Sequence, residues 1–148
     1  MSGDAVAGDV VRLWLRTVRS DLKSVRNNID GPEPSPESAA YHCQQAAEKL
    51  VKTVLVHQGI DPPRTHSIAA LLALLPEGDG LAALLRPFIR FTAFASAFRY
   101  PTAFLDEPEG IPTLDELRGW LGELIAAEAV VRAALLGAPE GGQGRAGG

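Results

Sequence analysis

Apolar residues recur every three or four positions over long stretches of this chain, and no stretch shows a convincing strand pattern. The first such stretch spans about residues 4–29, where the spacing predicts one long helix with a buried face. The residues of this predicted face are Val6, Val10, Leu13, Trp14, Val18, Leu22, Val25 and Ile29. Helices patterned in this way bury their apolar faces against one another, so the sequence predicts an all-α fold.

The second helix is predicted between two clear signals. Ser35 can cap the free backbone amides of a first helical turn, and Pro36 suits the first helical position. Gly59 suits the residue just past a helix end, where a positive φ is common. After a turn, a short third helix is expected at about residues 66–75.

Two more helical segments follow. The fourth covers about residues 81–98 and contains Pro87, which cannot donate an internal hydrogen bond, so we expect a kink or two abutting helices there. Thr113 and Glu116 have the spacing of a capping box, which predicts the start of a last helix that runs to about Leu136. Together these segments predict an antiparallel up-and-down bundle of about five helices, one of them short.

A chain of 148 residues is long enough for one domain with a real core, which we expect over residues 1–136, followed by a disordered glycine-rich tail over 137–148. The single Cys43 excludes an intrachain disulfide and a cysteine-based zinc site, and no metal or cofactor is expected. The net charge of −4 argues against nonspecific adhesion to nucleic acid or membranes. Without a secretory signal or a membrane-spanning apolar run, we expect a cytoplasmic protein.

Five cations of the first helix share one stripe by helical spacing, with no acid among them. They are Arg12, Arg16, Arg19, Lys23 and Arg26. At about 100° per residue, the stripe is expected opposite the apolar face. It is either a solvated surface or a phosphate-binding surface for RNA or a nucleotide, and the sequence leaves both interpretations open.

A second polar cluster is predicted on the second helix. Its members, at three- and four-residue spacings, are Gln45, Glu48, Lys49 and Lys52. Asp21 points into the predicted apolar face of the first helix and therefore needs a partner. The candidates for that partner are Lys49, Lys52 and Arg99. The cluster is either a network that fixes helix register or a cleft that receives phosphate or base edges.

The three histidines and the phenylalanines also have expected positions. His66 follows a turn, where it is placed to cap the third helix or to orient a ligand. We expect His42 to face solvent beside the polar cluster, and His57 to be exposed near the end of the second helix. The core or a dimer interface is expected to contain Phe88, Phe91, Phe94 and Phe98.

The order of these motifs resembles the HEPN domain family, named for nucleotide-binding members in higher eukaryotes and prokaryotes. The matching segments are Trp14 with Asp21-Leu22, the run from Gln44 to Lys52, Thr65-His66-Ser67-Ile68, and Arg99-Tyr100-Pro101. They cover about residues 5–135. The resemblance implies a bundle of four or five helices and a homodimer. Many bacterial members act with a minimal nucleotidyltransferase, often as a toxin–antitoxin pair.

Some members of this family bind nucleotides, and others are metal-independent RNases with an Arg four to six residues before a His. No such pair precedes His42, His57 or His66 here, so catalysis does not carry over. We therefore expect a noncatalytic nucleotide- or RNA-binding module. Its expected ligand-binding residues are Lys49, Lys52, His66, Arg99 and Tyr100. Its expected supporting network is Asp21, Gln45 and Glu48. The alternatives are a divergent RNase that uses His66 and a purely structural helical dimer.

Overall fold

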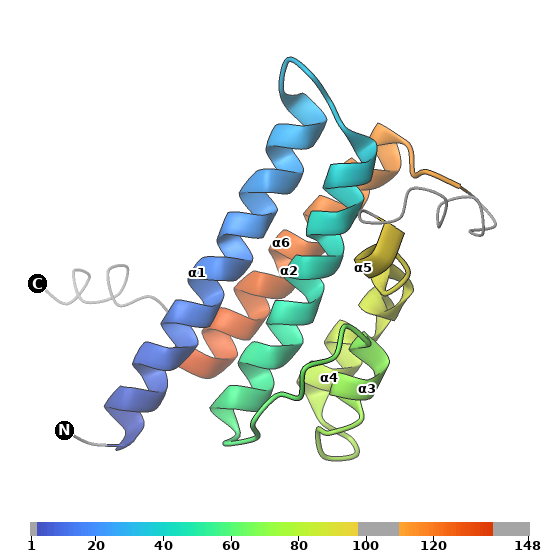
Figure 1. Ribbon diagram of the computed structural model, residues 1–148. Coiled ribbons are helices and arrows are strands. Elements are labelled where there is room, and N and C mark those ends of the chain that lie inside the picture. Colours follow the sequence, from blue (N-terminus) through green and yellow to red (C-terminus); the bar gives the residue numbers. More distant parts are fainter. Residues whose placement is uncertain (1–2, 98–109, 138–148) are drawn as a thin grey trace, which may run out of the picture.

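The computed structural model describes residues 3–97 and 110–137. The long helices of this part are α1 (Gly3–Asp30), α2 (Pro36–His57) and α6 (Leu114–Leu136). α1 packs along α2, and α6 crosses behind and contacts both (Figure 1). The described residues contain helices and no strand, which confirms the all-α class.

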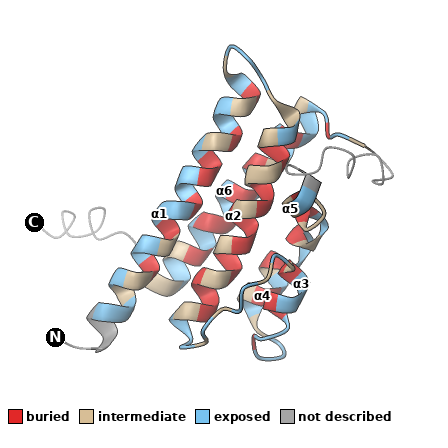
Figure 2. Cartoon of the chain, viewed as in Figure 1, coloured by how far each residue is buried: buried red, intermediate tan, exposed pale blue. Residues whose placement is uncertain are grey.

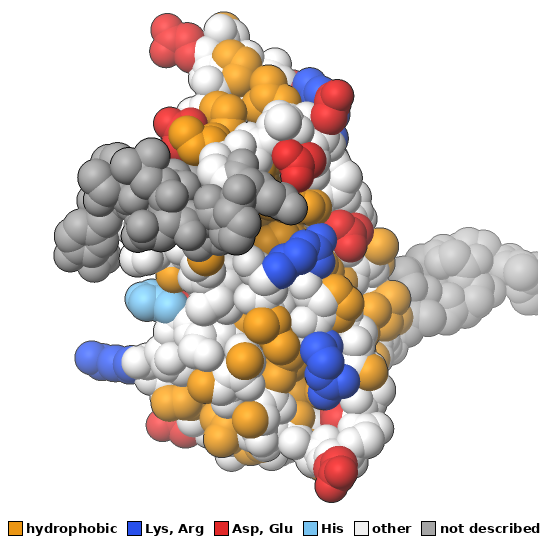
Figure 3. Space-filling view, turned by 90° about the vertical axis from the view of Figure 1, so that its right-hand side faces the viewer, with side chains coloured by type: hydrophobic (Ala, Val, Ile, Leu, Met, Phe, Trp, Pro, Cys, Tyr) orange, Lys and Arg blue, Asp and Glu red, His pale blue; other side chains and the backbone are white. Residues whose placement is uncertain are grey.

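Short helices between α2 and α6 carry the chain back along the side of α2 (Figure 1). They are α3 (Ile68–Leu72), α4 (Gly80–Leu85), the 3-10 helix η1 (Arg86–Phe91) and α5 (Phe94–Ala97). The helix expected over residues 81–98 is therefore divided, as far as it is described, into α4, η1 and α5. The first break lies beside Pro87, which occupies the first turn of η1. Figure 3 shows this side of the molecule, where apolar side chains lie among scattered basic and acidic ones.

Local signals place the helix ends largely where the sequence predicts them. Ser35 caps α2, and Thr113 and Glu116 make both hydrogen bonds of the capping box, at 3.1 and 3.0 Å. Gly59, just past α2, has a φ of 77°, which residues with a Cβ rarely adopt. The third helix begins later than expected, because Ser67 is its N-cap.

The core lies where α1, α2 and α6 face one another, as Figure 2 shows. The rotation of α1 differs from the prediction. Val11 and Leu15 are completely buried, whereas Val6 and Leu13, expected in the core, are 47% and 56% exposed. Apolar residues occupy too wide an arc of α1 to be covered completely, and only the arc between α2 and α6 is buried.

Aromatic residues of the short helices complete the core. Phe88, Phe91 and Phe94 are buried. The centroids of the Phe91 ring and the Trp120 ring of α6 are 5.0 Å apart. The expected core position of these phenylalanines is thus confirmed, while Phe98 lies outside the described residues. None of the described helices has both the length and the apolarity to cross a lipid bilayer.

Candidate functional site

Asp21 lies on the side of α1 that faces α2, and it is 7% exposed. Its Oδ2 accepts a hydrogen bond from Lys49 Nζ at 2.7 Å, and its Oδ1 lies 2.9 Å from His42 Nδ1. The prediction that buried Asp21 has a partner is confirmed, and Lys49 is one of the candidates that the sequence offered. The prediction that His42 simply faces solvent is wrong. His42 and Lys49 are seven residues apart on one face of α2, so the two side chains approach the carboxylate from either side.

Glu48 on α2 organises a second polar group, and it is 4% exposed. Its Oε2 accepts from Lys52 Nζ at 2.8 Å, and its Oε1 accepts from Gln44 Nε2 at 2.9 Å. His66 Nδ1 lies 2.9 Å from the same Oε1. Burial alone would raise the pKa of Glu48, but the hydrogen bonds from these three side chains and the charge of Lys52 outweigh it and lower the pKa. The carboxylate is therefore ionised at neutral pH.

The two glutamines of α2 connect the second group to the surface. Gln45 Nε2 donates to Gln44 Oε1 at 2.7 Å, and the completely buried Gln44 donates in turn to Glu48. The structure thus places all three predicted supporting residues around α2. We use "α2 cluster" for the whole set: Asp21, His42, Gln44, Gln45, Glu48, Lys49, Lys52 and His66.

The two lysines and two histidines of the α2 cluster reach the surface to different extents. The exposed side-chain fraction is 66% for His66, 27% for His42 and Lys49, and 15% for Lys52. Each imidazole contacts a carboxylate through Nδ1, which leaves Nε2 for an external partner. Arg99 and Tyr100, predicted to line the same site, lie outside the described residues. His57 is exposed, as predicted.

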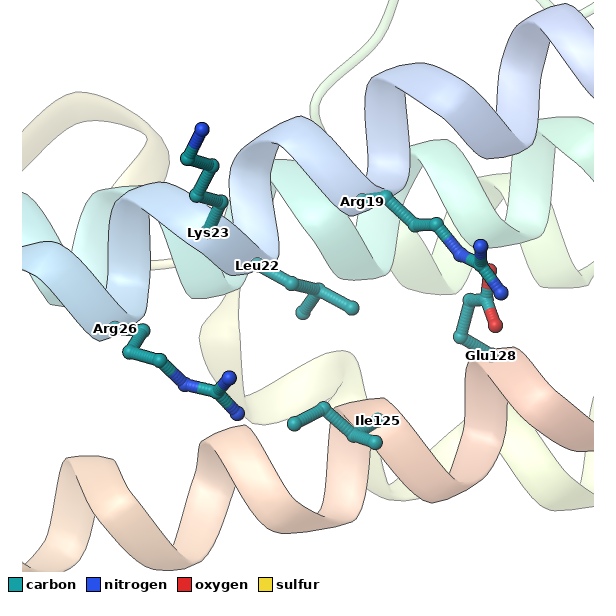
Figure 4. Close-up of a pocket in the computed structure, with 6 residues that line it drawn as sticks. All are labelled: Arg19, Leu22, Lys23, Arg26, Ile125 and Glu128. Carbon is teal, nitrogen blue, oxygen red and sulfur yellow. The ribbon is translucent and has the colours of Figure 1, made fainter.

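A second polar site lies between α1 and α6. A groove of about 340 Å³ is lined by Arg19, Leu22, Lys23, Arg26, Ile125 and Glu128, and we call it the α1–α6 groove. In Figure 4, Arg19 and Arg26 extend toward α6 on either side of Leu22 and Ile125, whereas Lys23 points away. The sequence predicted that the basic stripe lies opposite the core, and this prediction is wrong. The stripe borders the core, because α1 is rotated from the predicted orientation.

Glu128 of α6 is a buried carboxylate that the sequence interpretation missed. It is 5% exposed, and its Oε2 accepts from Arg19 Nε at 2.9 Å and from Arg132 Nη2 at 2.8 Å. Burial acts to raise the pKa of Glu128, but the hydrogen bonds and charges of the two arginines outweigh burial and lower it. Its position four residues after Leu124, on the apolar face of α6, is the signal that could have found it.

Among the described residues, the other cations of the stripe have no acidic partner on another helix. Arg12 lies 3.3 Å from Asp9, within its own helix. In the part of the chain that the structure describes, Arg16, Lys23 and Arg26 form no ion pair, and all three are exposed. The two polar sites therefore differ in charge balance.

Cys43 belongs to the core, and the acidic side chains that the structure describes do not gather into a metal site. Burial raises the pKa of the Cys43 thiol to about 12, despite the opposing charge of Arg90, and the residue packs as a small core side chain. Within residues 3–97 and 110–137, no three His, Cys, Asp or Glu side chains are grouped to hold a metal ion.

A family model described as the HEPN domain matches residues 11–133, which include most of α1, the α2 cluster and the α1–α6 groove. No curated protein and no solved structure matches the chain.

Proposed function

Because the chain belongs to the HEPN domain family, we propose that it is a noncatalytic module that binds a nucleotide or RNA at the α2 cluster. The observation that carries the proposal is the arrangement around Glu48. This buried carboxylate holds Lys52 and His66 in place, while the His66 side chain remains 66% exposed. A network that only fixes helix register does not require an exposed imidazole, whereas a binding site does require a side chain that a ligand can reach.

The chemistry of the α2 cluster suits a small phosphate-bearing ligand. Lys49 and Lys52 each give one hydrogen bond to a carboxylate and retain further N–H donors. Phosphate oxygens accept charge-assisted hydrogen bonds from such donors. Because each lysine is balanced by a carboxylate, the attraction depends on oriented hydrogen bonds at short range. That favours the phosphate group of a nucleotide over a long polyanion.

A thermal-shift experiment with mono-, di- and triphosphate nucleotides tests this proposal. A ligand that binds only the folded state raises the Tm by mass action. We expect a rise that is lost in His66→Ala, which removes an exposed side chain and leaves the core intact. His57→Ala removes another exposed histidine of the same region and should keep the rise. If no nucleotide raises the Tm of the wild-type protein, the purely structural dimer is the better interpretation.

His66 also supports a second candidate function, a divergent metal-independent RNase. Glu48 holds Nδ1 of the ring, so Nε2 remains for proton transfer at a ribose hydroxyl. Lys52 lies on the same carboxylate and could stabilise charge at the phosphate. Cleavage of RNA by the pure protein, resistant to chelators and abolished in His66→Ala, would establish this function. Intact RNA after prolonged incubation would exclude it.

The proposed module acts as a cytoplasmic homodimer with a nucleotidyltransferase partner, in a toxin–antitoxin pair. The family resemblance supports this arrangement, and so do the exposed apolar residues Val6 and Leu13, which a second copy could cover. Sedimentation of the purified protein tests the homodimer, and Leu13→Lys should favour the monomer. Co-purification with a nucleotidyltransferase from a neighbouring gene tests the partner, and two proteins that elute separately would count against it.

A further inference from the structure

The α1–α6 groove contains more positive charge than the fold uses. Its carboxylate, Glu128, is already shared by Arg19 and Arg132. Among the described residues, Lys23 and Arg26 have no acidic partner. Like charges on neighbouring helical turns repel one another. In a chain with a net charge of −4, a groove of this kind is suited to attract an anion from solution.

The shape of the groove indicates what kind of anion fits. Arg19 and Arg26 stand on either side of an apolar surface made by Leu22 and Ile125 (Figure 4), and Ile125 is 40% exposed. Guanidinium groups bind phosphate through their N–H donors and stack on planar rings through their faces. The combination of apolar surface and flanking guanidinium groups therefore suits a base or ribose between two phosphates.

The length of the basic stripe distinguishes a strand from a single nucleotide. From Arg12 to Arg26 the helix rises about 21 Å at 1.5 Å per residue, which exceeds the reach of one nucleotide. A stripe of that length matches a polymer that carries a charge at every unit. A flat anionic membrane would touch the ends of the long side chains and leave the recessed Leu22 surface uncovered.

We propose that the α1–α6 groove is a second binding site, which receives the backbone of a single-stranded RNA. Arg26, which extends toward α6, binds a phosphate inside the groove, and Lys23, which points away from α6, binds a phosphate at the outer edge of the groove. Arg19 donates through Nε to Glu128, which leaves both Nη groups for the strand. Leu22 and Ile125 contact a base or ribose. This site is separate from the α2 cluster and does not depend on nucleotide binding there.

The test is a titration of the full chain with a short labelled single-stranded RNA, followed by fluorescence anisotropy at several salt concentrations. The variant Lys23→Gln/Arg26→Gln should bind about tenfold more weakly at physiological salt. Its plot of log K against log salt should be shallower by about 1.4, since each phosphate contact with a single strand contributes about 0.7. Circular dichroism should show an unchanged fold, because both residues are exposed.

A charge-matched variant distinguishes a site from general electrostatics. Arg64→Gln/Arg86→Gln removes two other exposed cations that lie outside the groove, and it should bind RNA as the wild type does. Equal weakening in both double variants would overturn the proposal. So would wild-type binding to phosphatidylserine vesicles without binding to RNA, or no RNA binding at physiological salt. RNA binding lost in His66→Ala but kept in Lys23→Gln/Arg26→Gln would overturn the groove and leave the α2 cluster as the site.

Discussion

The α2 cluster and the α1–α6 groove use the same types of residue in different proportions. In the α2 cluster each lysine has its own carboxylate; the pairs are Asp21–Lys49 and Glu48–Lys52. In the groove one carboxylate serves two arginines; the set is Glu128 with Arg19 and Arg132. A balanced set holds its members in fixed positions but projects little field, whereas an excess of cations attracts anions from a distance.

The exposure of the cations also differs between the two regions. Lys52 is 15% exposed, whereas Arg19 is 60% exposed. Removing a carboxylate from the α2 cluster would leave a poorly solvated ammonium group without a counter-charge. The same change in the groove would release guanidinium groups that water can already reach. The two regions should therefore respond differently to equivalent substitutions.

The largest expected effect is on stability, in Glu48→Ala. We expect the free energy of unfolding to fall by about 3 kcal/mol, because buried Gln44 loses its acceptor and Lys52 loses its counter-charge. Urea denaturation at neutral pH measures the loss. Glu77→Ala, at an exposed position, is the control and should change stability very little. A loss as small as that of the control would show that the cluster contributes little to the fold.

A smaller loss of stability is expected in Glu128→Gln, of about 1–2 kcal/mol, because Arg19 is largely solvated. The same variant should bind single-stranded RNA more tightly, since it removes a negative charge from the groove. Glu123→Gln makes the same charge change at an exposed position of α6 and should affect RNA binding less. Weaker RNA binding in Glu128→Gln would instead mean that orienting Arg19 matters more than the added charge.

Acid should lower the free energy of unfolding through the carboxylates of both regions. The pKa values of Glu48 and Glu128 in the folded protein lie below their usual value of 4.5. The stability that these carboxylates contribute is therefore complete above about pH 4.5 and is lost as the pH falls through the lowered values. Urea denaturation between neutral pH and pH 3 should show a smaller loss in Glu48→Gln/Glu128→Gln than in the wild type. Parallel losses in the two proteins would assign acid sensitivity to other groups.

The smallest expected signal is the reaction of Cys43 with a thiol reagent. The residue is completely buried and its thiol has a pKa of about 12, so labelling of the native protein at pH 8 should be very slow. Because Cys43 lies on α2, Glu48→Ala should accelerate labelling more than Glu128→Gln does. Rapid labelling of the wild type would show that α2 opens readily.

Local sequence signals predicted the helices well and the polar sites only in part. The caps at Ser35 and Thr113 and the glycine after α2 act over one helical turn, so neighbouring residues suffice to specify them. The Glu48–Lys52 pair was also predictable, since its members are four residues apart on one helix. The predicted ligand residues Arg99 and Tyr100 remain predictions.

The sequence could not predict which side chains of different helices contact one another. Asp21 had three candidate partners, and only the packing of α1 on α2 brings Lys49 and His42 to it. Glu128 has one partner four residues along its own helix, Arg132, but its other partner, Arg19, is more than a hundred residues away in the chain and could not be assigned to it from the sequence. The position of the basic stripe depended on how far α1 is rotated about its own axis, which its broad apolar arc leaves undetermined.

The sequence by itself determined the all-α class, the ends of the long helices and the presence of polar side chains that the fold would have to accommodate. These properties follow from hydrogen bonding and apolar spacing within single helices. Only the tertiary structure decided which carboxylate of one helix meets which cation of another. Ion pairing requires two side chains within a few ångströms, and that distance is set by how whole helices pack. The balanced α2 cluster and the cationic α1–α6 groove are both products of that packing.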